Sequence, residues 1–255
     1  MAYELNKEEN KTLTKIKAVP YLAETLKQID KFVANNVQTP KENWKLVFNQ
    51  IHNILFQALP FVNEYLAKRK QSGEIQNEKQ AIKSIAGNSF SQALVYIFLN
   101  NKIHENVRSD VFITSQKSKV RNFNKLSTIN VDGETQKPDC DLIIYTYTEN
   151  KELPNCIILS LKTSLRERAG QTYKWKLLME IATSANSIKE KYNISYEADE
   201  MPLVCFATVN FYNEINNPQH RGMFKFFDNA FIAKDVNADF ISKLSELPDY
   251  VNANL

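Results

Sequence analysis

The residues that build disulfides, zinc sites and phosphate-binding loops are scarce in this chain. It has three cysteines, three histidines and five glycines among 255 residues. Cys140, Cys156 and Cys205 are odd in number, far apart and outside any C-x-x-C pair, which argues against a disulfide framework or a structural zinc site and favours a reducing compartment. No two histidines have the spacing of metal ligands, and His220 has no evident partner and no assigned role. Glycine is too rare for a loop that cradles phosphate.

Long apolar runs are also missing from the sequence. No stretch approaches the roughly 18 to 20 apolar residues that span a bilayer, and the first ten residues are polar and acidic, unlike a secretory signal. The composition, with 43% apolar and 24% charged residues and a mean hydropathy of -0.41, is that of a globular protein in water. We therefore expect a cytoplasmic protein. The net charge of +3 is too small to identify a nucleic-acid partner by itself.

The first 70 residues or so have the apolar spacing of helices. Apolar side chains recur at steps of three and four over residues 21–33, and a second stripe runs over 44–62. Thr39 and Pro40 predict the N-cap and the first position of the second helix. Pro60 predicts a kink within it.

A mixture of strands and helices is expected beyond the polar stretch 68–74. The expected elements are a buried helix over 87–100, strands over 111–114, 141–147, 156–162, 202–209 and 230–233, and one long helix from about 166 to 192. This order predicts an α/β (α+β) fold with a mixed central sheet flanked by helices. The polar stretch divides an N-terminal helical subdomain, residues 1–75, from a sheet-containing domain, residues 76–255.

Charged side chains fall at the ends of two neighbouring strands. Asp139 and Asp141 share one face at the start of the first strand, and Ser160 and Lys162 share one face at the end of the second, because strand side chains alternate. A lysine that ends an apolar strand is costly to bury without a partner. We therefore expect carboxylate and ammonium groups to meet at one edge of the sheet.

Such a meeting has a catalytic and a non-catalytic interpretation. A carboxylate and a backbone carbonyl can hold Mg²⁺, which polarises phosphoryl oxygens and lowers the pKa of a water molecule. A neighbouring lysine can orient that water and offset the charge that develops on phosphorus. The alternative is an ion pair at the surface without any catalytic role.

The same segments resemble a known family. Residues 137–145 read KPDCDLIIY and residues 161–168 read LKTSLRER, which is similar to the PD-(D/E)XK nuclease superfamily. Within it, the match is to type II restriction endonucleases that recognise CCGG or CC…GG sites, above all BsaWI-like enzymes. The resemblance implies a restriction-endonuclease-like core, with Asp139 and the Leu161 carbonyl as ligands of Mg²⁺ and Lys162 as the catalytic group that orients water.

The chain departs from the family pattern at the middle acid. Ser160 occupies that position in the catalytic motif, and relatives with this change take a carboxylate from the following helix, in a region that holds Trp175 and Lys176 here. The nearest acid in that helix, Glu180, is the predicted second metal ligand and a catalytic residue. Asp141 competes with Asp139 for the role of first ligand.

The triplet Arg166, Glu167 and Arg168 is the candidate for base readout. An arginine can donate two hydrogen bonds to O6 and N7 of guanine, and a glutamate can accept one from N4 of cytosine. The resemblance implies that the triplet reads G·C pairs in the major groove, although charged triplets are also common on solvated helix ends. Candidates for DNA-backbone contacts, which solvated charges would equally explain, are Lys117, Lys119, Arg121 and Lys174.

The resemblance predicts a Mg²⁺-dependent endonuclease that cleaves double-stranded DNA at a palindromic site with a CCGG or CC…GG core. A palindrome matches two-fold protein symmetry, so a homodimer is expected. The family also implies a bacterial or archaeal cell and a partner methyltransferase. The N-terminal helices would serve dimerisation or DNA clamping. Two alternatives remain, a nuclease-fold DNA-binding module that has lost catalysis and a repair nuclease that reads structure on the same core.

Overall fold

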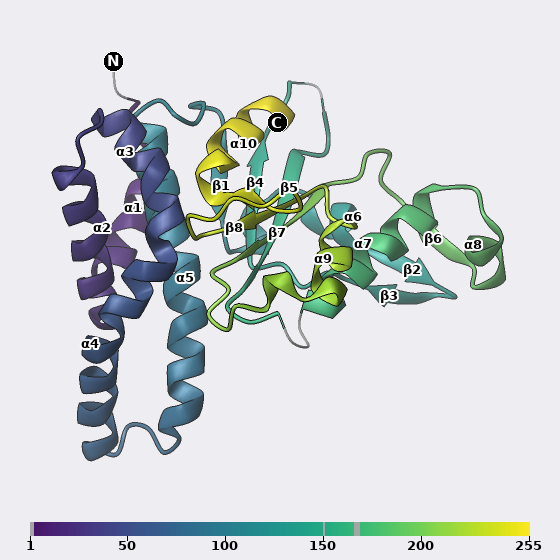
Figure 1. Cartoon of the computed structure of the whole chain (residues 1–255). Helices are drawn as coiled ribbons and strands as arrows, with labels where there is room; N and C mark the ends of the chain where they lie inside the picture. Colours follow the sequence, from purple (N-terminus) through teal and green to yellow (C-terminus); the bar gives the residue numbers. More distant parts are fainter. Residues whose placement is uncertain (1–2, 150, 166–168) are drawn as a thin grey trace.

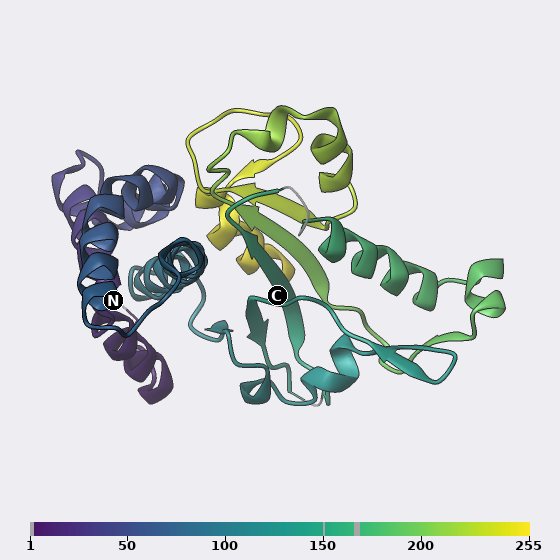
Figure 2. The same cartoon turned by 90° about the horizontal axis from the view of Figure 1, so that it is seen from below.

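The computed structural model describes residues 3–149, 151–165 and 169–255 (Figure 1). A layer of helices stands beside one face of a six-stranded sheet, and further helices cover the opposite face (Figures 1 and 2). This arrangement confirms the predicted α/β fold with a mixed central sheet and an N-terminal helical region. None of the described helices combines the length and apolar character needed to cross a bilayer.

The N-terminal layer consists of five α-helices. They are α1 (Lys7–Lys17), α2 (Ala23–Asn35), α3 (Pro40–Leu46), α4 (Ile51–Gln71) and α5 (Glu78–Ile103), with 3-10 turns at η1 (Pro20–Leu22) and η2 (Val47–Gln50). The predicted N-cap at Thr39 is confirmed, because its side chain accepts a hydrogen bond from the Glu42 N–H while the Glu42 carboxylate accepts one from the Thr39 N–H. Helix α4 continues through Pro60.

The remaining helices lie between or after the strands. They are α6 (Phe123–Ser127), α7 (Ala169–Thr183), α8 (Ser187–Lys191), α9 (Pro218–Phe224) and α10 (Leu247–Asn254), with 3-10 turns at η3 (Lys117–Lys119), η4 (Glu214–Asn216) and η5 (Leu244–Glu246). Helix α7 covers the sheet face opposite α5 (Figure 2).

The central sheet has the strand order β1-β4-β5-β7-β8-β9. Its strands are β1 (Phe112–Thr114), β4 (Leu142–Thr146), β5 (Asn155–Lys162), β7 (Leu203–Thr208), β8 (Asn229–Ile232) and β9 (Ser242–Lys243). Strands β1, β4 and β5 pair antiparallel, whereas β5, β7, β8 and β9 run parallel. The strands predicted at 111–114, 141–147, 156–162, 202–209 and 230–233 are therefore confirmed within one or two residues.

Strand β5 separates two apolar cores. Ile157, Leu159 and Leu161 belong to the core that the sheet forms with the N-terminal helices, and Cys156 and Ile158 belong to the core under α7 and α9. The alternation of strand side chains accounts for this division. The same alternation places the side chains of Ser160 and Lys162 on the side of the sheet that α7 covers.

A second, three-stranded sheet was not predicted. Its strands are β2 (Ile129–Val131), β3 (Glu134–Gln136) and β6 (Ile194–Tyr196), in the order β3-β2-β6. The turn between β2 and β3 is formed by Asp132 and Gly133, with φ of 48° and 86°. Asp-Gly is a preferred pair for two-residue hairpin turns, because both turn positions need positive φ. This dipeptide was the local signal for the hairpin.

The single long helix predicted over residues 166–192 is wrong, since the described part of this segment forms α7 and α8 with a break between them. At the break, the Ser184 hydroxyl donates to the Glu180 carbonyl (2.7 Å). The Asn186 side chain accepts from the Lys189 N–H (2.9 Å) and so caps α8. Short polar side chains compete with backbone groups for hydrogen bonds, which ends one helix and starts the next.

Candidate active site

Asp139, Asp141 and Lys162 meet at one edge of the central sheet. The Lys162 Nζ donates to the Asp139 Oδ2 at 2.7 Å and to the Asp141 Oδ2 at 3.1 Å. The lysine side chain is only 6% exposed, whereas those of Asp139 and Asp141 are 48% and 33% exposed. The predicted meeting of carboxylate and ammonium groups is confirmed, and its cation is buried rather than at the surface.

The register of β4 and β5 creates the space for this cluster. The first pair of the antiparallel ladder is Leu142 with Leu159, so β5 extends beyond the start of β4. In that extension the Leu161 N–H donates to the Asp141 Oδ2 at 2.7 Å. Because the N–H and C=O of one strand residue point to the same edge, the Leu161 carbonyl also faces the side of β5 on which Asp141 lies.

The electrostatics of the cluster depend on the two acids. Burying an ammonium group is unfavourable unless anions and hydrogen bonds compensate for the lost water, and Asp139 and Asp141 provide both to Lys162.

Cys140 lies between the two acids in sequence. Burial raises the pKa of its thiol to about 12, while the nearby Lys117 acts to lower it. Burial therefore favours the protonated form of this thiol at neutral pH.

Ser160, at the position of the middle acid, joins α7 to the sheet. Its hydroxyl lies 3.1 Å from the hydroxyl of Thr172, and both residues are fully buried. The hydroxyl pair is satisfied within the core under α7. In this chain the position supplies a packing contact between strand and helix instead of a carboxylate.

Glu180 is not brought to this cluster. Its carboxylate pairs with Lys176 (3.4 Å), and the buried Lys176 also binds Asp228 (2.9 Å). Asp228 accepts from the N–H of Val204 at the start of β7, whereas Lys162 pairs with the end of that parallel strand. Among the residues that the structure describes, no group of three or more His, Cys, Asp or Glu side chains could hold a metal ion.

The residues predicted to contact DNA fall into three groups: some lie outside the described residues, some have protein partners, and some are exposed. The base-reading candidates Arg166, Glu167 and Arg168 lie outside the described residues. Among the predicted backbone contacts, Lys119 pairs with Glu8 (2.8 Å). Arg121 stacks on the Tyr147 ring and donates to the Lys151 carbonyl (2.8 Å). Lys117 and Lys174 are exposed.

Sequence analysis missed Glu214, at the start of η4. Its carboxylate accepts from the Leu165 N–H at 2.7 Å and from the Ser164 hydroxyl at 3.2 Å. It therefore binds the backbone just before the predicted base-reading triplet. His220, for which the sequence shows no evident partner, lies with its Nδ1 2.8 Å from the Glu214 carbonyl oxygen.

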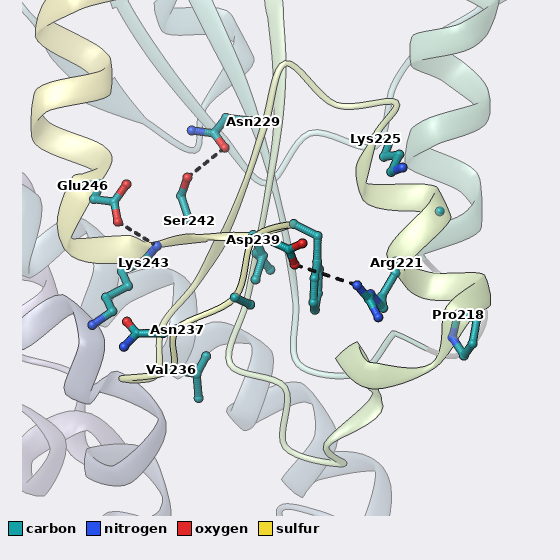
Figure 3. A pocket seen from close by; sticks show the side chains of 14 residues that line it. Pro218, Arg221, Lys225, Asn229, Val236, Asn237, Asp239, Ser242, Lys243 and Glu246 are labelled. Carbon is teal, nitrogen blue, oxygen red and sulfur yellow. Dashed lines mark hydrogen bonds and ion pairs between the residues drawn. The ribbon is translucent and has the colours of Figure 1, made fainter.

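A large cavity of about 1130 Å³ lies away from the acidic pair, between α9 and the segment that leads into β9 (Figure 3). Arg221 points toward Asp239 across it, with 3.8 Å between their charged groups, and Lys225 and Lys243 also line it. Its lining residues are drawn from 218–246 and do not include the aspartates or the lysine of the candidate site. This cavity is therefore separate from the candidate active site.

The fold and the site together define a class of protein. A lysine that ends a central strand and binds acids from the segment just before the neighbouring antiparallel strand is the arrangement expected of a restriction-endonuclease-like nuclease core. Residues 114–250, which extend from the end of β1 into α10, match the family described as BsaWI restriction endonuclease type 2. Because the match covers more than half of the chain, the protein belongs to this family of deoxyribonucleases. No curated protein sequence matched the chain.

Proposed function

We propose that this restriction endonuclease cleaves double-stranded DNA at a palindromic site with a CCGG or CC…GG core, in a reaction that depends on Mg²⁺. The observation that carries the proposal is the buried Lys162 ammonium between Asp139 and Asp141, inside the segment that matches the family. Phosphodiester hydrolysis needs a carboxylate for a cation and a positive group near the attacked phosphorus. Both groups are present at this edge of the sheet.

Asp139 is the better candidate for the first metal ligand. The Oδ2 of Asp141 already accepts from both Leu161 and Lys162, whereas the more exposed Asp139 accepts from Lys162 alone in the described contacts. We therefore assign Asp141 to positioning the lysine and the end of β5. Asp141 remains the alternative ligand if the lysine moves when DNA binds.

The donors at this edge fit Mg²⁺. This ion prefers oxygen ligands, keeps several waters and is often bound by one or two carboxylates together with substrate phosphate. The Asp139 carboxylate and the Leu161 carbonyl would supply the protein oxygens. When bound, the cation would polarise the phosphoryl oxygens of the scissile bond. Lys162 would hold the attacking water and offset negative charge in the transition state.

Substitution of Glu180 tests whether it supplies the second carboxylate. We expect Glu180→Ala to keep its Mg²⁺-dependent cleavage rate within about threefold, because the Glu180 carboxylate pairs with Lys176 near the start of β7. Cleavage rates at several Mg²⁺ concentrations measure this effect, with Asp139→Ala as the variant expected to be inactive. A large loss that excess Mg²⁺ restores in Glu180→Ala would instead make Glu180 a ligand.

The triplet Arg166, Glu167 and Arg168 would read G·C pairs, and Lys117 and Lys174 would contact phosphates. A palindromic site is read most simply by a two-fold dimer, so we propose a homodimer, with the N-terminal helices serving dimerisation or DNA clamping. A methyltransferase of the same specificity would protect the host DNA. These assignments rest on the family resemblance and on the charges of the residues.

Incubation of the purified protein with plasmid DNA and Mg²⁺ tests the proposal. We expect discrete fragments whose sequenced ends share a CC…GG core, and no cleavage when EDTA removes the metal. Specific binding without cleavage would instead favour a nuclease-fold binding module, an outcome in keeping with the hydroxyl of Ser160 at the middle-acid position. Nicking that follows DNA structure rather than sequence would favour a repair nuclease.

A further inference from the structure

Hydrogen bonds join the chain that leaves β5 to the chain that leaves β7. The Thr163 carbonyl accepts from the Phe211 N–H at 3.3 Å. The Glu214 carboxylate accepts from the Leu165 N–H at 2.7 Å and from the Ser164 hydroxyl at 3.2 Å. Hydrogen bonds to a carboxylate are shorter and stronger than those between neutral groups. Each of the three residues that follow Lys162 is therefore attached to the segment after β7.

The segment that carries Glu214 is itself fixed to the sheet. The Asn210 side chain accepts from the Glu214 N–H at 2.7 Å, and the Thr208 hydroxyl accepts from the Asn210 N–H at 2.9 Å. Asn210 is buried and has φ of 50°, a left-handed conformation that asparagine tolerates better than most residues. Thr208 pairs with Lys162 in the sheet register. Glu214 is thus linked by hydrogen bonds to the strand pair that carries the catalytic lysine.

The side chain of Leu165 is fixed in place as well as its backbone N–H. Its side chain is fully buried in the core under α7 and α9. With its N–H bound to Glu214 and its side chain packed in the core, Leu165 has little freedom to move relative to Lys162. The chain therefore enters the predicted base-reading triplet from a fixed point three residues after the catalytic lysine.

We propose that Glu214 is a positioning residue for DNA recognition, and that it sets the register between the base-reading triplet and the scissile phosphate. This inference rests on the proposed function of Arg166, Glu167 and Arg168. Base readout tolerates little displacement, and small errors in positioning cost about 100-fold in rate even far from the reacting atoms. Loss of the Glu214 contacts would therefore weaken the preference for the correct site more than it weakens the chemistry at any one site.

The test compares Glu214→Ala, Glu214→Gln and a matched control, Asp228→Ala. Like Glu214, Asp228 accepts a hydrogen bond from a backbone N–H, in this case that of Val204 (2.6 Å). Val204 lies at the start of β7, whereas Glu214 lies in the segment that follows the end of this strand. For each variant, the rate of cleavage at the cognate site is divided by the rate at a site with one G·C pair replaced. Hydrogen exchange of the Leu165 amide reports the contact itself, independently of cleavage.

We expect Glu214→Ala to lower the discrimination ratio about tenfold and to speed exchange at Leu165. Glu214→Gln, whose amide oxygen can still accept the Leu165 N–H, should keep the ratio within about threefold. Asp228→Ala should lower thermal stability without changing either readout. Unchanged exchange in Glu214→Ala, or faster exchange with an unchanged ratio, would overturn the inference. A wild-type protein that cuts without sequence preference would reject the proposed function instead, before any variant is compared.

Discussion

Lys162→Ala should lose DNA cleavage by at least about 100-fold while it retains binding to the specific site when Ca²⁺ replaces Mg²⁺. Removal of one group that stabilises charge in the transition state typically costs about 100- to 1,000-fold in rate. Lys162 is the buried cation that lies between the two acids of the site. Cleavage rates on a single-site DNA fragment, together with gel-shift affinity in Ca²⁺, separate catalysis from binding.

Lys176→Ala is the matched control for this substitution. Lys176 is a second buried lysine on the same side of the sheet and is also held by two carboxylates, those of Asp228 and Glu180. Both substitutions should lower the unfolding temperature, because each leaves partly buried acids without their cation. Only the loss of Lys162 should abolish cleavage. Continued cutting by the Lys162 variant would remove this lysine from the mechanism.

Arg168→Ala should cost about 1 to 3 kcal/mol of discrimination between the correct and an altered G·C position, if its guanidinium makes a bidentate contact with guanine. This corresponds to roughly 5- to 150-fold in the ratio of cleavage rates, at about 1.4 kcal/mol for each factor of ten. The measurement compares the cognate site with a set of sites in which each G·C pair is replaced in turn. The effect should be confined to one position of the site.

Lys174→Ala is the corresponding control, because Lys174 is an exposed cation on the helix that follows the triplet. Loss of a phosphate contact should weaken binding about equally at all sequences and reduce the dependence of affinity on salt. A preference at G·C positions that stays unchanged in Arg168→Ala would contradict the readout assignment.

The main features of the site could be predicted because they depend on local rules. Strand alternation determines that Ser160 and Lys162 share a face, and the short connection between two apolar strands determines that Asp139 lies opposite the lysine. The sequence pattern also located the sheet strands and the cap at Thr39. The physical cost of burying a lone lysine also predicts the ion pair that Lys162 makes.

Features that depend on distant contacts could not be predicted in this way. Glu214 binds Leu165 across 49 residues of sequence, and nothing near Glu214 in the chain indicates that partner. The position of Glu180 along the helix predicts a metal ligand, but the direction of α7 across the sheet takes this residue toward Asp228. The hairpin at Asp132 and Gly133 does have a local signal, because Asp-Gly is a preferred pair for two-residue turns. Its strands are only three residues long, so their apolar pattern is too short to predict them.

The N-terminal helices and the central sheet share one apolar core, and this affects whether the segment that matches the nuclease family can fold without those helices. Ile157, Leu159 and Leu161 of β5 share a single core with Phe98 of α5 and Ile51 of α4, yet the family match begins only at residue 114. A fragment restricted to the matched residues would expose this face of β5, at about 1.5 to 3 kcal/mol for each aliphatic side chain. The loss from these three side chains alone is comparable to the 5 to 15 kcal/mol of net stability of a typical protein. We therefore expect the N-terminal helices to be needed for the stability of the nuclease part, and deleting them to test their contribution to DNA binding should lower the unfolding temperature of the enzyme.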